Sequence, residues 1–148
     1  MTNSFNYLKT ALSENRADYP FTGNTQSCAY NAAHGVVSTT GYTDIATNDP
    51  DAHIAALENG PISVAVEADS SVFQFYKSGI LSSTACGTNL NHAVNIIGYG
   101  SDSGTLYWLV RNSWGTSWGE AGYFRVLRDT TSGPGICGIL SMSSQPTI

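Results

Sequence analysis

The spacing of hydrophobic residues changes from a helical period to an alternating one along the chain. Near the N-terminus, Phe5, Leu8 and Leu12 recur at positions that share one face of a helix. Thr2 or Ser4 can provide the side-chain cap that helices prefer at their first turn. The sequence therefore predicts a short helix that packs one apolar face against another part of the protein.

A second helix is predicted to start at Asp49–Pro50. The Asp49 carboxylate can cap this helix, and Pro50 fits its first position, where the missing N–H of proline is not needed. The dipeptide Gly60–Pro61 is expected to end it. The inner face of this helix is expected to consist of Ile54, Ala55 and Leu57.

Beyond this helix the pattern predicts strands. Ile62, Val64 and Val66 alternate with the residues between them, which indicates a strand with one buried face. A short helix is expected at 70–76. Later runs rich in β-branched and aromatic residues predict further strands at 94–99, 107–111 and 123–127. Because glycines separate these runs at turn spacing, antiparallel strands in a barrel or sandwich are favoured over parallel strands joined by helices.

Composition and charge exclude several classes of function. The 148 residues include 6 Lys+Arg and 11 Asp+Glu, and the few cations are scattered, so no basic stripe for nucleic acid is present. No run approaches the ~20 apolar residues of a membrane-spanning helix, which argues against a membrane protein. The three cysteines match no zinc-ligand spacing, so no metal site is expected.

Two sequence words in the second half carry the most specific signal. They are NHAVNIIGYG, which begins at Asn91, and YWLVRNSWGTSWGEAGYFRV, which begins at Tyr107. They resemble the segments around the active-site histidine and asparagine of papain-like cysteine proteases. The likeness covers nearly the whole chain and is strongest to the cathepsin L branch, as further words show: YPFTG, SCAYN, GPISVAVEA, FQFYKSGI and GICGI. The resemblance implies an α+β, papain-like fold. Residues 1–44 would finish the helical left domain, and residues 45–148 would form the antiparallel β-barrel of the right domain.

The resemblance assigns a catalytic role to two polar residues. His92 matches the general base and acid of the family, and Asn112 matches the residue whose amide oxygen orients the imidazole ring. An imidazolium stabilises a thiolate and later protonates the leaving amine, while a neutral amide orients the ring without adding charge. Spacing alone favours a core histidine and a turn asparagine, and the words NHAV and NSWG reverse that preference. His34 and His53 have no such context and are expected to be surface or hydrogen-bonded histidines.

Aromatic and apolar residues around the site are assigned in the same way. Trp114 resembles the indole that covers the histidine–asparagine hydrogen bond, and Trp118 resembles one that lines the leaving-group side. A further pocket would receive the second substrate side chain on the N-terminal side of the scissile bond. Its lining would be Ala65, Leu90, Ala93 and Met142, with Met1 at the rim. Because all of these residues are apolar, an apolar substrate side chain is expected there.

The nucleophile of this family lies in a CGSCW-like word about 130–150 residues before the histidine. The resemblance therefore implies that this chain is a C-terminal portion without the nucleophile, and that Met1 is an internal methionine. Cys28, in the word TQSCAYN, resembles a half-cystine whose partner would lie in the absent N-terminal part. Cys86 and Cys137 match a disulfide pair of the barrel domain. The alternative, three reduced thiols, would fit a reducing compartment.

The resemblance thus implies the C-terminal part of a lysosomal or secreted papain-like endopeptidase that is inactive alone and needs no metal or organic cofactor. Its expected partners are polypeptide substrates, the missing N-terminal part of the enzyme, and a propeptide or protein inhibitor. A second hypothesis is a non-proteolytic homologue or fragment with a binding or structural role. The two hypotheses differ in whether cysteine or serine stands at the nucleophile's position before Met1.

Overall fold

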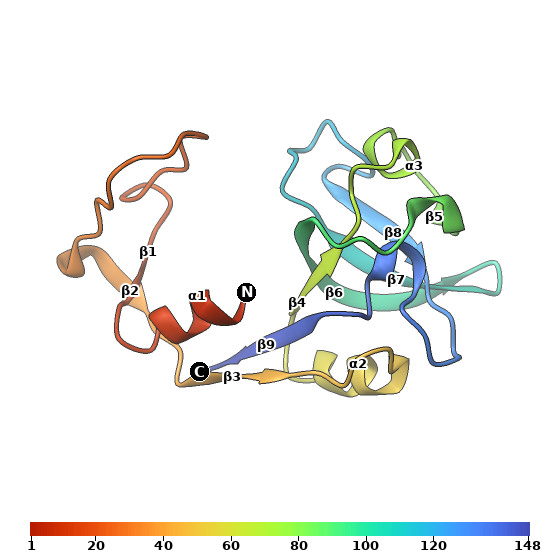
Figure 1. Cartoon of the computed structure of the whole chain (residues 1–148), viewed down its shortest axis with the longest axis horizontal. Coiled ribbons are helices and arrows are strands. Elements are labelled where there is room, and N and C mark those ends of the chain that lie inside the picture. Colours follow the sequence, from red (N-terminus) through yellow and green to blue (C-terminus); the bar gives the residue numbers. More distant parts are fainter. The chain divides into compact units, whose positions relative to one another are not determined.

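The computed structural model describes residues 1–148, which divide into two compact units (Figure 1). The first unit comprises Met1–Thr43 together with Pro146–Ile148, and the second comprises Asp44–Gln145. Two strands, β3 (Gly41–Asp44) and β9 (Ser143–Thr147), run across the points where the chain passes from one unit to the other.

The first unit has little regular structure. Its elements are the helix α1 (Thr2–Tyr7), the antiparallel strands β1 (Ser13–Glu14) and β2 (Gly35–Val37), and the 3-10 turn η1 (Ala32–His34). The predicted first helix exists, but it ends at Tyr7, so Leu12 lies outside it. Met1 occupies the N-cap position and no side chain caps the helix, so the expectation that Thr2 or Ser4 caps it was wrong. Without a side-chain cap, a six-residue helix depends on packing for its stability.

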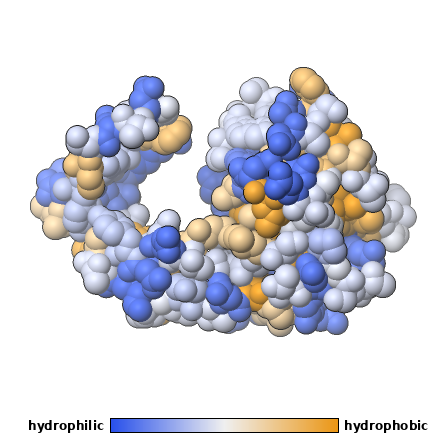
Figure 2. Space-filling model, viewed as in Figure 1, coloured by the Kyte–Doolittle hydropathy of each residue, from blue (hydrophilic) through white to orange (hydrophobic).

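Hydrophobic residues of the first unit are mostly exposed. Ala11 is its only buried hydrophobic residue. In the view of Figure 2, this unit presents mainly hydrophilic and intermediate residues with hydrophobic ones scattered among them. Its exposed large hydrophobic side chains are Tyr7, Leu12, Tyr19, Phe21, Val36, Val37 and Ile148. A unit that buries so little apolar surface lacks the main driving force for folding independently.

The second unit is built on an antiparallel-rich sheet, as the α+β class requires. Its strands are β4 (Ile62–Val66), β5 (Ile80–Leu81), β6 (His92–Asp102), β7 (Thr105–Arg111) and β8 (Tyr123–Leu127). With β3 and β9 the order is β3-β9-β4-β6-β7-β8-β5, and only β5 and β8 pair in parallel. Its helices and 3-10 turns are α2 (Pro50–Leu57), α3 (Ser71–Gln74), η2 (Thr84–Cys86) and η3 (Ile136–Gly138). The longest helix has eight residues, and none combines the length and hydropathy that a membrane span requires.

Helix α2 begins as the sequence predicts. The Asp49 side chain accepts a hydrogen bond of 3.0 Å from the backbone N–H of Ala52, and Pro50 occupies the first turn. The inner face differs by one position, because Ala55 is exposed and Ala56 instead packs against the core with Ile54 and Leu57. His53 shares this inner face and is completely buried. The expected inner face was therefore correct for the two larger residues and wrong for Ala55.

The core of the second unit lies on one face of the central strands. Ile62, Val64 and Val66 of β4 are fully buried, as their alternation predicts. Antiparallel pairing then sets β6 against β4, with Val64 opposite Val94, and sets β7 between β6 and β8. The largest apolar side chains that complete this core are Phe73, Trp108, Phe124, Ile96, Ile139 and Leu140. This arrangement fixes the start of β6 and the end of β7, where the candidate site lies.

A disulfide bond joins the two 3-10 turns of the second unit. Cys86 in η2 and Cys137 in η3 are bonded with their Cα atoms 4.9 Å apart, as the resemblance implies. Both residues are buried. Because they are bonded to each other, the alternative of three reduced thiols does not hold in this structure. The bond closes a loop with a sequence separation of 51 residues across the sheet.

Candidate active site

His92 and Asn112 meet at the edge of the sheet. His92 is the first residue of β6, opposite Val66 of β4, and Asn112 directly follows the last residue of β7. His92 Nε2 lies 2.8 Å from Asn112 Oδ1. An amide oxygen can only accept a hydrogen bond, so Nε2 must carry the proton that it donates. The other ring nitrogen, Nδ1, is left to exchange a proton with a reacting group.

Two further hydrogen bonds hold Asn112 in place. Its Oδ1 also accepts a 2.7 Å hydrogen bond from the backbone N–H of Ser113, and its backbone N–H donates to the Gly122 carbonyl at 3.0 Å. Asn112 is buried, whereas His92 is half-buried. A buried acceptor held at two points presents its oxygen to the ring in one orientation, which is how an orienting residue works.

Aromatic rings surround the hydrogen bond. The Trp114 indole lies against the His92 ring with centroids 5.1 Å apart and planes inclined by 34°. The buried Phe73 meets Trp114 edge to face at 5.4 Å, and Trp118 packs on both of these rings, 5.3 Å from each. Excluding water on this side strengthens the hydrogen bond, because the local dielectric constant falls.

An open depression with a volume of about 700 Å³ lies beside His92. It is lined by Ala68, Asp69, Gln74, Phe75, Asn91, His92 and Trp114. The Asn91 side-chain oxygen accepts a 2.8 Å hydrogen bond from the backbone N–H of Ala68, so the residue next to His92 is anchored to the end of β4. Phe75 is 74% exposed and supplies apolar surface. The depression can accommodate a peptide side chain.

Two of the expected substrate-pocket residues lie in neighbouring strands, and Met142 lies directly before β9. Ala65 of β4 lies opposite Ala93 of β6, and the Ala65 N–H donates to the Met142 carbonyl at 3.1 Å. Leu90 is half-buried and Met142 is exposed, while Met1 belongs to the first unit. These residues lie outside the depression beside His92. The sheet register brings Ala65, Ala93 and Met142 together.

Trp118 is half-buried and packs against Phe73 and Trp114. It does not line the depression, and its Nε1–H donates to the Gln74 carbonyl at 3.0 Å. Three further site residues were not predicted individually from the sequence: Phe73, Gln74 and Phe75, which follow one another in and after α3. The word FQFYKSGI carried the signal for them, because it was among the words that support the resemblance.

The remaining histidines and the free cysteine lie apart from the His92–Asn112 pair. His53 Nδ1 lies 2.7 Å from the Asp49 carbonyl and Nε2 lies 2.7 Å from Ser143 Oγ, so both ring nitrogens are used, and burial lowers the pKa of His53. His34 is partly exposed, 3.8 Å from Glu14. Cys28 is exposed and belongs to the first unit. No group of His, Cys, Asp or Glu side chains in the structure could hold a metal ion.

Comparison with known proteins identifies the family. Residues 1–147 match the profile of the papain family cysteine proteases. The chain is 45% identical over 129 residues to KDEL-tailed cysteine endopeptidase CEP2 of Arabidopsis thaliana, covering 86% of this chain and 36% of that protein. It is 40% identical over 149 residues to vignain of Vigna mungo, covering 99% and 41% respectively. The chain thus spans less than half the length of these curated relatives.

Solved structures agree with this match. Bromelain from Ananas comosus, in complex with an inhibitor, superimposes with a TM-score of 0.89 at 41% identity, covering 99% of this chain and 68% of that one. Digestive procathepsin L 3 of the Tenebrio molitor larval midgut superimposes with a TM-score of 0.92 at 34% identity, covering 100% and 48%. With both the sequence profile and the fold in agreement, the chain belongs to the papain family of cysteine proteases.

Proposed function

We propose that this chain supplies the histidine–asparagine half of a cysteine endopeptidase active site. The observation that carries the proposal is the 2.8 Å hydrogen bond between His92 Nε2 and Asn112 Oδ1 beneath Trp114. It leaves Nδ1 of His92 as the ring nitrogen that can exchange a proton. The relatives of this chain include a cysteine endopeptidase and vignain, and they support peptide-bond hydrolysis as the reaction of the whole enzyme.

In the proposed mechanism, a cysteine thiol outside this chain gives its proton to His92 Nδ1 and attacks the substrate carbonyl carbon as a thiolate. The imidazolium then donates that proton to the leaving amine, the C–N bond breaks, and a thioester remains. A water molecule loses a proton to the same nitrogen and hydrolyses the thioester, which releases the acid and restores the thiol. Asn112 keeps the ring oriented throughout and transfers no proton.

The chain is expected to have no peptidase activity by itself. Cys86 and Cys137 are bonded to each other, and Cys28 lies in a word unlike that of the family's nucleophile. The exposed hydrophobic side chains of the first unit support docking of the remaining part of the enzyme on that unit. Solved relatives with a bound inhibitor or in a proenzyme form support an inhibitor or a propeptide as a further partner.

The proposed substrate class and location follow from the residues described. The neighbouring apolar residues Ala65, Ala93 and Met142 support a preference for an apolar side chain at the second position before the scissile bond. The Cys86–Cys137 disulfide supports a lysosomal or secreted location, because disulfides persist in oxidising compartments.

Joining the chain to the upstream part of the same gene product, or to that of a relative such as vignain, tests the proposal. His92→Ala should abolish hydrolysis of a fluorogenic peptide, while Asn112→Ala should reduce it by about 10–100-fold because the ring is only misoriented. His34→Ala and Asn95→Ala, away from the His92–Asn112 hydrogen bond, are the matched controls.

A thiol alkylator should stop the reaction of the joined enzyme. Equal losses in the His92 and Asn112 variants would contradict the assigned roles. Activity of the 148-residue chain alone, lost in Cys28→Ser, would contradict the missing nucleophile. A joined protein with no hydrolysis at all would favour the second hypothesis, a non-proteolytic homologue with a binding or structural role.

A further inference from the structure

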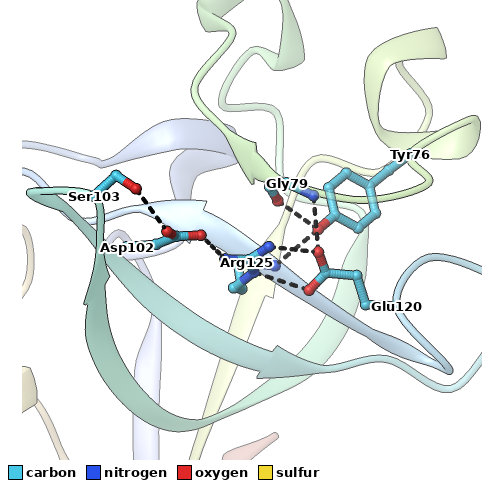
Figure 3. Close-up of polar contacts among 6 residues, drawn as sticks. All are labelled: Tyr76, Gly79, Asp102, Ser103, Glu120 and Arg125. Atoms are coloured by element: carbon cyan, nitrogen blue, oxygen red, sulfur yellow. Dashed lines mark hydrogen bonds and ion pairs between the residues drawn. The ribbon is translucent and has the colours of Figure 1, made fainter.

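An ion-pair network joins Arg125 to two carboxylates of the second unit (Figure 3). Arg125 of β8 forms two parallel hydrogen bonds with Glu120, from Nε to Oε2 at 2.9 Å and from Nη2 to Oε1 at 2.8 Å. Its third nitrogen, Nη1, donates to Asp102 Oδ2 at 2.8 Å. These bonds lower the pKa of Glu120 and of Asp102, so both carboxylates are charged at neutral pH.

The network also fixes the segment that follows α3. Glu120 Oε1 accepts a 2.8 Å hydrogen bond from the backbone N–H of Gly79, and the Gly79 carbonyl accepts one of 2.6 Å from the Tyr76 hydroxyl. The same hydroxyl accepts a 3.2 Å hydrogen bond from the backbone N–H of Arg125. Figure 3 shows Glu120 and Tyr76 converging on Gly79 from two sides. Both backbone groups of one glycine are therefore held by the network.

From Tyr76 a continuous series of aromatic contacts leads to His92. The buried Tyr76 ring lies 5.5 Å from Trp118, Trp118 lies 5.3 Å from Trp114, and Trp114 lies 5.1 Å from the His92 ring. Trp118 is also tied to the residues of α3 through its bond to the Gln74 carbonyl. Neither Glu120 nor Arg125 lines the depression beside His92.

The backbone between Trp118 and Glu120 is conformationally restricted. Gly119 has φ +56°, and a Cβ there would lie 2.6 Å from the Tyr123 carbonyl oxygen and 3.1 Å from the Tyr76 ring. Glu120 and Tyr123 exchange hydrogen bonds of 2.8 and 3.1 Å. The position of Glu120 is therefore transmitted to Trp118 by one residue in a restricted conformation.

We propose that the Glu120–Arg125 ion pair is a positioning element for the active-site pair: it holds Trp118, and through it Trp114, over the His92–Asn112 hydrogen bond. The inference rests on the proposed function, because it gives these residues their purpose in catalysis. Asp102 shares the same arginine but has no contact with Gly79 or Tyr76 in the network. It therefore offers a control that neutralises the other carboxylate partner of the same cation.

The first test uses this chain alone and nuclear magnetic resonance. The Trp114 indole, in contact with the His92 ring, alters the chemical shifts of the His92 ring protons. Glu120→Gln should move these chemical shifts at least halfway to their values in an unstructured peptide. It should speed hydrogen exchange of the Trp118 indole N–H by about tenfold, the effect of losing a charge-assisted bond. Asp102→Asn should leave both signals close to those of the parent chain.

Unchanged signals in Glu120→Gln would overturn the proposal, and so would equal changes in the two variants. Should Glu120→Gln fail to fold, Arg125→Lys replaces it, since lysine keeps the charge but cannot form two parallel bonds. The same comparison with Asp102→Asn then decides.

The second test uses the joined enzyme. Glu120→Gln should lower kcat by about tenfold while KM changes by less than about twofold, because the substrate surface is intact. A rise in KM alone would overturn the positioning role. Because the resonance test needs no catalysis, failure of the proposed function and failure of this inference give different results.

Discussion

Replacing the buried His53 should remove a large part of the acid sensitivity of the second unit. The ring is completely buried, its Nδ1–H donates to the Asp49 carbonyl, and Nε2 accepts from Ser143 Oγ, so the neutral form is the one that fits. Burial lowers the pKa of His53 below its ordinary value of 6.5, although its bond to the Asp49 carbonyl and the Asp49 charge oppose that change.

The sign and the size of the effect follow from proton linkage. Below about pH 6.5 this histidine binds a proton in the unfolded chain but stays neutral in the folded chain. The free energy of unfolding therefore falls as the pH falls. The slope of the free energy of unfolding against pH approaches the value for one bound proton, about 1.4 kcal/mol per pH unit. The free energy of unfolding should therefore fall by up to about 2 kcal/mol between pH 6.5 and 5. Carboxylates, with ordinary pKa values near 4, contribute mainly below this window.

Urea unfolding followed by tryptophan fluorescence measures this slope. All three tryptophans, Trp108, Trp114 and Trp118, belong to the second unit, so the signal reports on that unit. His53→Gln should be less stable than the parent by about 1–3 kcal/mol at pH 7.5, and this difference should shrink or reverse at pH 5. His34→Gln is the matched control at an exposed site. A slope that is unchanged in His53→Gln, or flattened in His34→Gln, would refute the reasoning.

Two further predictions concern the disulfide and the substrate pocket. Replacing both Cys86 and Cys137 by alanine should lower the free energy of unfolding by about 4 kcal/mol, the loop-closure effect for a separation of 51 residues. Thermal unfolding with and without a reductant measures this effect: reduction should lower the Tm of the oxidised parent and leave the Tm of the variant unchanged. In the joined enzyme, Met142→Glu should raise the cleavage of peptides that carry arginine at the second position before the scissile bond. The new carboxylate would form an ion pair with the arginine side chain. Profiling on a peptide library measures this, and an unchanged preference would mean that Met142 lies outside the pocket.

Local sequence signals predicted the parts of the fold that depend on neighbouring residues. The Asp49 cap, Pro50 and the alternation of Ile62, Val64 and Val66 each act within a few positions, and the structure contains the corresponding helix and strand. The extent of the first helix was not predictable in this way. No glycine or proline follows its last turn to mark the end, and the helix ends at Tyr7 with Leu8 as its C-cap.

Features that depend on distant residues could not be derived from local patterns. Strand β9 has the sequence SSQPT, which has low β-propensity, and it forms because Ser143 and Ser144 pair with β4. Ser143 in turn provides a hydrogen-bond partner for the buried His53, 90 residues away in the sequence. At the candidate site, His92 and Asn112 were found only through the family words around them. The Glu120–Arg125 network lay inside one of those words without being recognised.

The division of the chain into units determines how the protein can be cut into fragments. The polypeptide passes between the units twice, after Thr43 and after Gln145, so no single cut separates them. The last residues belong to the first unit's own hydrogen bonding, since the Thr40 backbone N–H donates to the Thr147 carbonyl at 2.8 Å and their hydroxyls lie 3.1 Å apart. A fragment limited to residues 1–43 would lose this strand partner, as would a chain trimmed before Pro146. A circularly permuted chain that links Ile148 to Met1 and opens after Thr43 would instead make the first unit one continuous segment.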